Sequence, residues 1–318
     1  MKLSIVTTLY MSAPYVTEFC KRASFEAQKL FEYDYEIIIV NDGSPDGALD
    51  IAVKAAEQDK HITIVDFSRN FGHHKALMTG LEFAKGEFVF LIDADLEEEP
   101  EWLSEFFNRM ISEECDVVYG VQKERKGRMF ERISGGVFYK LINLLTGLKM
   151  PENIVTARLM SRRYVDALLL HREREIFLAG LWHITGFKQV EYKVIKHNTS
   201  PSTYTLRKKM AIIMNSVTSF TETPLAMIFY CGIVITIVAF VYIVWIIVKQ
   251  IISPTTISGW VSTMAAVLLF GGLNASFIGI VGIYLSKIYI EVKQRPYTIV
   301  KKVYNDLHKQ TEEHNNKI

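Results

Sequence analysis

Two aspartates separated by one residue are the strongest candidates for chemistry in this chain. Asp93 and Asp95 follow an apolar stretch with the pattern of a buried strand. A hard divalent cation prefers carboxylate oxygens and keeps positions free for phosphate oxygens and water. Paired aspartates also cap turns, and the acidic run Glu97-Glu98-Glu99 before Pro100 favours the start of a helix. The pair alone leaves metal binding and a turn both open.

Further polar motifs follow other predicted strands. In the run Asn41-Asp42-Gly43-Ser44-Pro45-Asp46, the glycine permits a tight turn, and Asp42 and Ser44 can hydrogen-bond a base or ribose. An ordinary Asx turn explains the same run when it stands alone. The third motif is Ser68-Arg69-Asn70-Phe71-Gly72-His73, in which the histidine could touch phosphate or serve in packing. Tyr10 and Ser12 follow the first strand, so polar residues after four strands indicate one shared site.

The elements that must position these motifs alternate along the N-terminal half of the chain. Strand patterns cover residues 3–9, 35–40, 62–67, 88–92 and 116–119, with helical patterns between them. This alternation predicts an α/β domain with a mostly parallel sheet, whose ligands bind beyond the carboxyl ends of the strands. Residues 121–205 are less regular, with a helix predicted over 127–145. We assign residues 1–205 to this domain.

Two apolar stretches near the C-terminus predict transmembrane helices over residues 223–249 and 262–287. No charged residue lies between Glu222 and Lys249, and residues 263–284 form a second apolar run. Each run is long enough at helical rise to cross a bilayer, which makes a pair of buried helices in a soluble core the weaker interpretation. We expect residues 206–222 to form an interfacial amphipathic helix and residues 288–318 to form a C-terminal tail, polar after Thr311.

Basic residues flank the two predicted spans and set the expected orientation. They are Arg207, Lys208 and Lys209 before the first span, and Lys287, Lys293, Arg295, Lys301 and Lys302 after the second. The positive-inside rule then places both termini in the cytoplasm, as in a multi-pass protein of the cell (inner) membrane. The N-terminus has the pattern of a strand and carries no export signal.

Composition excludes two other classes of function. Cys20, Cys115 and Cys231 have no metal-site spacing, and three cysteines in a cytoplasmic setting do not form a disulfide framework. The net charge is +1, and no basic patch interleaved with aromatic residues suggests nucleic-acid binding.

Taken together, the motifs resemble family 2 glycosyltransferases with the GT-A (Rossmann-like) fold. The resemblance is closest to polyprenyl-phosphate glycosyltransferases, the group of dolichyl-phosphate mannose synthase and the bacterial undecaprenyl-phosphate glucosyl and aminoarabinosyl transferases. It spans nearly the whole chain and rests on Asp42, Arg69-Asn70-Phe71-Gly72, the Asp93/Asp95 pair, Arg158-Leu159-Met160-Ser161-Arg162, Ser202-Thr203-Tyr204 and paired spans ending near Arg295-Pro296.

The resemblance implies a reaction and a set of site residues. The expected reaction is inverting transfer of a sugar from a nucleotide sugar, with UDP as the expected nucleotide, to undecaprenyl phosphate. The expected donor-site residues are Thr7, Tyr10, Asp42, Ser44, Arg69, Asp93 and Ala94. Asp93 and Asp95 are expected to hold Mg²⁺ or Mn²⁺ and to act in catalysis together with Arg158. The expected acceptor-phosphate residues are Arg158, Ser202, Tyr204 and Arg207.

Several residues depart from the family pattern. The run Val155-Thr156-Ala157-Arg158 aligns with Gly-Asp-Phe-Arg, so Thr156 replaces the usual acidic residue. This chain has Glu97-Glu98-Glu99-Pro100 where the family commonly has Gln-Asp-Pro-Pro. It also has Ala179 in place of an arginine and Thr203 in place of a lysine. A sugar hydroxyl needs a base to accept its proton, whereas a polyprenyl phosphate is already an anion and mainly needs positioning. The missing acid therefore does not exclude catalysis with a phosphate acceptor.

Two other functions stay open at this point. One is a family 2 enzyme that elongates a saccharide hydroxyl, which requires another carboxylate to replace the missing acid. The other is a non-catalytic membrane scaffold or sugar-nucleotide sensor, against which the retained aspartate pair argues.

The spans also suggest which partners to expect. Two spans are too few for a pore, so we expect a separate flippase. The glycines Gly271, Gly272, Gly279 and Gly282 in the second span make a homo-oligomer plausible.

Overall fold

The computed structural model describes residues 1–122, 153–196, 223–252 and 259–305. These residues belong to two compact units. The first unit includes residues 1–122, 153–196 and 295–305, and the second includes residues 223–252 and 259–294. The predicted helices over 127–145 and 206–222, and the polar tail after Thr311, lie outside the described residues.

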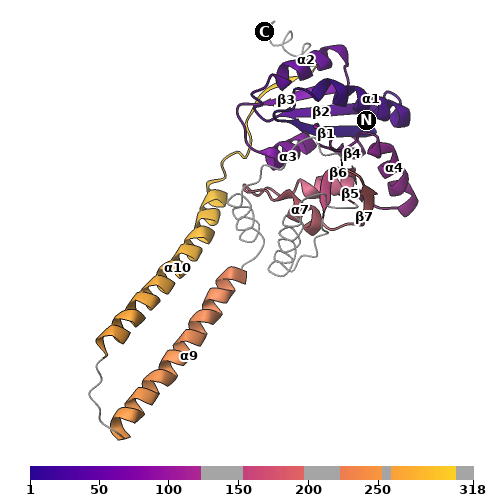
Figure 1. Ribbon diagram of the computed structural model, residues 1–318. Helices are drawn as coiled ribbons and strands as arrows, with labels where there is room; N and C mark the ends of the chain where they lie inside the picture. The colour runs from indigo at the N-terminus through magenta and orange to yellow at the C-terminus, as the bar shows by residue number, and fades with distance from the viewer. Residues whose placement is uncertain (123–152, 197–222, 253–258, 306–318) are drawn as a thin grey trace. The chain divides into compact units, whose positions relative to one another are not determined.

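The first unit is an α/β fold in which strands and helices alternate (Figure 1). Its strands are β1 (Leu3–Leu9), β2 (Tyr35–Asn41), β3 (Ile62–Phe67), β4 (Phe88–Leu91), β5 (Val117–Gln122), β6 (Ile154–Ser161), β7 (Gln189–Val194) and β8 (Val300–Tyr304). Its helices are α1 (Val16–Phe31), α2 (Ala48–Gln58), α3 (His73–Phe83), α4 (Trp102–Glu113), α6 (Arg162–Leu168) and α7 (Leu178–Ile184). All five predicted strands are present, with ends shifted by a few residues.

The described strands form one sheet in the order β7-β5-β6-β4-β1-β2-β3-β8. The neighbours β4-β1-β2-β3 are all parallel, and β7 is parallel to β5. Strand β6 runs antiparallel to β4 and β5, and β8 runs antiparallel to β3. The predicted GT-A-like fold with a mostly parallel sheet is confirmed. The carboxyl ends of β1 to β4 meet at one edge, where the polar motifs were expected.

Helices cover both faces of the central strands, which explains why β1 is buried along its whole length. Ile5 and Leu9 pack in the hydrophobic core with residues of α1, α2 and α4. Val6 points to the opposite face, because side chains alternate along a strand. A Cβ added to Gly80 of α3 would lie 2.5 Å from Val6 Cγ1, so the glycine allows α3 to approach the sheet closely.

The predicted C-terminal tail needs correction, because residues within 288–318 form regular structure. Helix α10 continues to Lys293, and β8 adds to the sheet beside β3. The backbone N–H of Ser68 donates to Ile299 O at 3.0 Å, and the Tyr297 hydroxyl donates to Glu82 Oε1 at 2.5 Å. Sequence periodicity missed β8 because this edge strand is exposed over most of its length and has no buried face to impose an apolar pattern.

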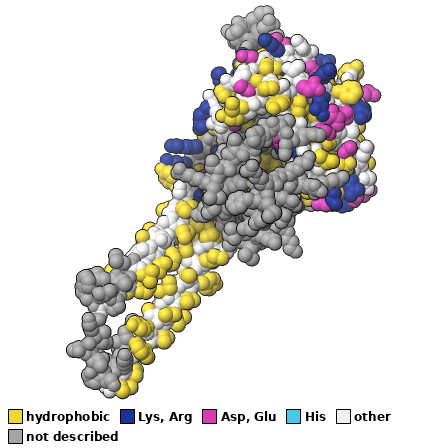
Figure 2. Space-filling view, in the orientation of Figure 1, with side chains coloured by type: hydrophobic (Ala, Val, Ile, Leu, Met, Phe, Trp, Pro, Cys, Tyr) yellow, Lys and Arg dark blue, Asp and Glu magenta, His cyan; other side chains and the backbone are white. Residues whose placement is uncertain are grey.

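The second unit contains the two predicted apolar helices, α9 (Thr223–Ile252) and α10 (Trp260–Lys293). The windows Thr223–Tyr242 and Leu269–Lys293 have mean hydropathies of 2.5 and 1.6, and neither is buried within the protein. Figure 2 shows hydrophobic side chains along the surface of both helices. Phe240 and Leu269 are among the exposed apolar residues. Both helices exceed the length of about 20 residues that a membrane span requires.

Candidate functional site

The loops after β1 and β2 are tied together by side-chain hydrogen bonds. Ser44 Oγ accepts the backbone N–H of Met11 at 2.7 Å and donates to Asp46 Oδ1 at 2.5 Å. Asp46 Oδ2 accepts the backbone N–H of Ala13 at 2.8 Å. Tyr10 stands half-exposed beside these contacts. Two of the predicted donor-site residues, Tyr10 and Ser44, therefore come from loops that are joined at the same sheet edge.

Asp42 is buried at the end of β2 and anchors the loop after β3. Its two carboxylate oxygens accept the backbone N–H groups of Phe71 at 2.6 Å and Gly72 at 3.0 Å. Asn70 Nδ2 donates to the Asp42 carbonyl at 3.1 Å. Burial raises the pKa of the Asp42 carboxyl, while the two N–H donors oppose this rise. The predicted nucleoside-contacting residue thus also shapes the loop of residues 68–72.

The remaining predicted donor-site residues occupy different environments. Thr7 and Ala94 are buried, and Thr7 lies on the same strand face as the core residues Ile5 and Leu9. The hydroxyl of Thr7 has no hydrogen-bond partner among the described residues. Arg69 is exposed, with its guanidinium carbon 4.1 Å from the centroid of the Phe71 ring.

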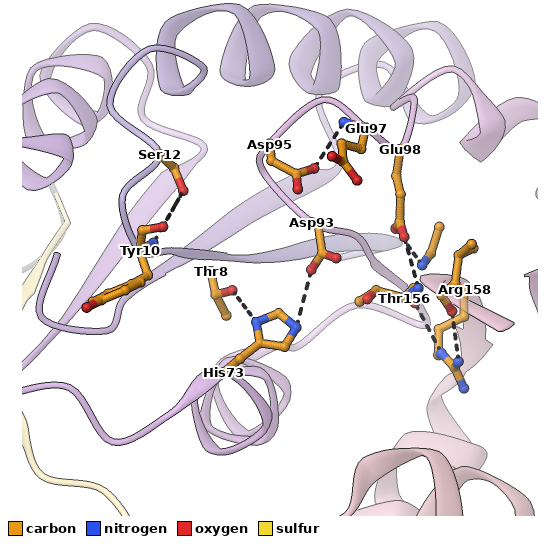
Figure 3. Close-up of polar contacts among 12 residues, drawn as sticks. Thr8, Tyr10, Ser12, His73, Asp93, Asp95, Glu97, Glu98, Thr156 and Arg158 are labelled. Atoms are coloured by element: carbon orange, nitrogen blue, oxygen red, sulfur yellow. Dashed lines mark hydrogen bonds and ion pairs between the residues drawn. The ribbon is translucent and has the colours of Figure 1, made fainter. Parts of the chain in front are cut away.

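Asp93 lies against the N-terminus of α3, where His73 connects it to β1 (Figure 3). Thr8 Oγ1 is 3.1 Å from His73 Nδ1, and His73 Nε2 is 3.4 Å from Asp93 Oδ1. The histidine that the motif suggested as a phosphate contact or packing residue therefore bridges two strand ends beside the aspartate pair. Its neighbour His74 has its Nδ1 3.1 Å from the Ile176 carbonyl, and burial lowers the pKa of this imidazole.

The surroundings of the aspartate pair are compatible with a bound divalent cation. Asp93 Oδ1 is buried and receives no hydrogen bond from the described residues. Burial and the charge of Asp93 raise the pKa of Asp95, and a bound cation would relieve both effects. Within the described residues, no three His, Cys, Asp or Glu side chains gather as a metal cage. Mg²⁺ typically takes one or two carboxylates and completes its shell with phosphates and water, so the pair fits a metal shared with a diphosphate.

Glu98 occupies a position that the acidic run did not predict. The helix expected after this run begins only at Trp102, and Glu98 is fully buried before it. Its Oε1 accepts the backbone N–H of Thr156 at 3.0 Å, and its Oε2 accepts that of Ala157 at 2.8 Å (Figure 3). Burial and the charge of Asp93 raise the pKa of Glu98 to about 8. A carboxyl group thus lies beside Thr156, the position where family resemblance expects an acid.

Lys196 is a second residue that sequence reasoning missed. It follows β7, and its Nζ lies 3.2 Å from Glu97 Oε2 and 3.6 Å from Glu98 Oε1. Burial lowers its pKa, but the surrounding carboxylates, Glu98 first, raise it by more. No local signal marked this lysine, because its role depends on the end of β7 meeting the loop after β4.

Arg158 is 1% exposed in β6. Its Nε donates to the Thr156 carbonyl at 3.2 Å, and its guanidinium stacks on the ring of Trp182 in α7. It lines a pocket of about 360 Å³ together with Tyr119, Ala179, Trp182 and Phe187. The structure therefore places this predicted acceptor-phosphate residue in a pocket wall. The other three, Ser202, Tyr204 and Arg207, lie outside the described residues.

Comparison with known proteins identifies the family. A family model described as glycosyl transferase family 2 matches residues 4–169. The chain is 46% identical to a Mycobacterium tuberculosis protein named "Putative glycosyltransferases", over 96% of this chain and 89% of that protein. It is 33% identical to the prophage bactoprenol glucosyl transferase homolog of Escherichia coli, over 95% and 99% of the two chains. It is 32% identical to the bactoprenol glucosyl transferase of Shigella phage SfII, over 95% and 98%. The chain therefore belongs to glycosyl transferase family 2.

Proposed function

We propose that the chain transfers a sugar, with inversion, from a nucleotide sugar to a polyprenyl phosphate at the cytoplasmic face of a membrane. The observation that carries this proposal is the lack of an acidic side chain at residue 156 of β6, where the family resemblance expects one. Thr156 has no carboxylate, and the adjacent Glu98 is fully buried with both oxygens accepting backbone N–H groups. Neither residue is placed to take a proton from an acceptor hydroxyl, whereas a phosphate acceptor needs no such base.

The donor binds at the sheet edge formed by β1 to β4. In this proposal, Tyr10, Asp42, Ser44 and Arg69 contact the nucleotide sugar, with a UDP-sugar as the first candidate, and the buried Thr7 and Ala94 support the site from within the fold. Asp93 and Asp95 hold Mg²⁺ or Mn²⁺, which supplies Lewis-acid stabilisation of the departing diphosphate when bound. The buried Oδ1 of Asp93 supports this assignment, because it accepts no hydrogen bond from the described residues and its contact there is the His73 imidazole at 3.4 Å.

The transfer is a single displacement. A phosphate oxygen of the acceptor attacks the anomeric carbon on the face opposite the nucleotide, and the new carbon–oxygen bond forms as the bond to the diphosphate breaks. The nucleoside diphosphate leaves with the bonding electron pair. Arg158, Ser202, Tyr204 and Arg207 are the proposed acceptor-side residues, and their role is to orient the phosphate for attack.

A lipid acceptor is supported by the relatives and by the second unit. Several relatives carry the name bactoprenol glucosyl transferase. Helices α9 and α10 have the length and composition of membrane spans. Strand β8, which follows α10, pairs with β3, which precedes α9, and this pairing supports a topology in which both ends of the helical pair lie on one side of a membrane. The basic residues after the second span indicate the cytoplasmic side. The lipid-linked product then needs a separate flippase.

Turnover measurements distinguish this proposal from its rivals. The purified full chain is incubated with a panel of nucleotide sugars, Mn²⁺ or Mg²⁺, and either undecaprenyl phosphate or saccharide acceptors, and nucleoside diphosphate release is measured. We expect release that depends on the lipid phosphate and is lost in Asp95→Ala. Release only with saccharide acceptors supports an elongating enzyme. Nucleotide-sugar binding without turnover on any lipid phosphate supports a scaffold or sensor.

A further inference from the structure

Carboxylates crowd the loop that follows β4. Asp93, Asp95, Glu97 and Glu98 all come from this short segment. Asp95 Oδ1 accepts the backbone N–H of Glu97 at 3.0 Å, so the loop turns back beside the aspartate pair (Figure 3). A nucleoside diphosphate adds further negative charge here, and like charges at short range oppose its binding. The loop needs a source of positive charge in addition to a bound metal.

Lys196 brings a positive charge to this loop from the end of β7. Its ammonium lies within ion-pair distance of both Glu97 and Glu98, and its side chain is only 19% exposed. An ion pair at this depth is screened less by water and salt than one on the open surface. The charges of Asp93 and Asp95 also act on Lys196, in addition to those of its two partners.

One partner of Lys196, the Glu98 carboxyl, is held in place by the protein backbone. Glu98 is anchored by the backbone N–H groups of Thr156 and Ala157, and Glu97 follows the Asp95 turn. The lysine therefore meets a rigid acceptor group on the segment that carries the aspartate pair. Its position is set by three elements that come together only in the folded protein, namely the β4 loop, β6 and the end of β7.

We propose that Lys196 is a positioning residue of the donor site, which pairs with Glu97 and Glu98 and offsets the negative charge of the loop after β4 so that a nucleoside diphosphate binds beside Asp93 and Asp95. This inference rests on the proposed function for the identity of the donor. It predicts opposite effects on two ligands. Without the lysine the site is more negative, which weakens binding of a diphosphate and strengthens binding of a free divalent cation. A purely structural role would weaken both.

Binding to the full-length chain in detergent tests this inference without turnover. Mn²⁺ binding is measured by electron paramagnetic resonance in the absence of nucleotide, and UDP and GDP binding by calorimetry in the presence of Mn²⁺. In Lys196→Met we expect the Kd of the nucleotide bound by the wild type to rise about tenfold, with the Kd of Mn²⁺ unchanged or lower. Lys196→Arg keeps the charge and restores nucleotide binding. Lys193→Met removes an exposed lysine of the same strand and leaves both constants unchanged.

Glu97→Gln provides a second test that does not depend on the folding of the lysine variant. It removes a negative charge, so we expect tighter nucleotide binding and weaker Mn²⁺ binding, the reverse of Lys196→Met. Two results would overturn the role of Lys196. One is unchanged nucleotide binding in Lys196→Met. The other is weaker binding of both the nucleotide and Mn²⁺ in Lys196→Met and in Glu97→Gln alike. If the wild type binds neither UDP nor GDP, the donor assignment of the proposed function fails, and the role of Lys196 fails with it.

Discussion

Glu98 Oε1 accepts a hydrogen bond from the backbone N–H of Thr156 at 3.0 Å, and this contact joins the loop after β4 to strand β6. It places a carboxyl group beside Thr156, where the acid expected from the family resemblance is missing. The group is buried and engaged with the backbone, so it serves the architecture of the site. The same contact therefore supports the proposed phosphate acceptor.

Replacement of Glu98 by glutamine tests this anchoring through stability. In Glu98→Gln, a side-chain NH₂ group takes the place of one carboxyl oxygen that accepts a backbone N–H. Two hydrogen-bond donors then face each other, which lowers the unfolding free energy by about 1–3 kcal/mol. Chemical denaturation of the full chain in detergent measures this loss. Glu57→Gln, an exposed change on α2, is the matched control and is expected to have little effect.

The loss in Glu98→Gln should depend on pH. The folded-state pKa of Glu98 is raised from 4.5 to about 8, so between these values the folded chain holds a proton that the unfolded chain has released. The contribution of Glu98 to stability therefore falls as pH rises through this window. We expect the gap between wild type and Glu98→Gln to be larger at pH 5 than at pH 8. A gap that widens with pH would contradict the raised pKa.

Asp95→Asn should separate metal binding from stability. The amide oxygen can still accept the backbone N–H of Glu97, while the negative charge beside Asp93 disappears. We expect the metal-free variant to be as stable as the wild type or slightly more stable, and its Mn²⁺ affinity to fall at least about tenfold because a charged ligand is lost. Thermal unfolding and paramagnetic resonance measure the two quantities. A large loss of stability would show that Asp95 is mainly structural.

Gly43→Ala should disturb the anchor between Asp42 and the loop of residues 68–72. Gly43 has a φ of +63°, and an added Cβ would lie 2.6 Å from the backbone nitrogen of Asn70. We expect a cost of roughly 2–4 kcal/mol from strain and overlap together. Gly47→Ala is the control, because Gly47 has a φ of +77° and nothing within 4 Å of the added Cβ. Equal losses in the two variants would mean that the close approach to Asn70 does not matter.

Truncation tests whether β8 belongs to the folded catalytic unit. A chain that ends after Pro296 loses the β3–β8 pairing, the Tyr297–Glu82 hydrogen bond and the Thr79–Thr298 contact. It also exposes the edge of β3, so we expect a lower melting temperature and more aggregation. A chain that ends after Asn305 keeps these contacts and serves as the control. Identical melting curves for both truncations would rule out a stabilising role for β8.

Part of the fold follows from local sequence patterns. The apolar runs of β1 to β4 predict buried parallel strands, and the turn residues after them mark where the chain leaves the sheet. The long charge-free runs predict α9 and α10 for the same local reason. In contrast, β6, β7 and β8 were missed. Strand β8 is largely exposed and β7 is only partly buried, so neither carries a clear alternation.

The sequence by itself determined the chemical character of this protein: the aspartate pair, the polar strand ends, the two apolar helices and the family. Only the tertiary structure decided which side chains meet. It brought His73 to Asp93, Glu98 to Thr156 and Lys196 to Glu97. The physical reason is that sequence patterns report on neighbouring residues along the chain. The partners of a buried carboxyl group come from strands and loops that are far apart in the sequence and meet only when the chain folds.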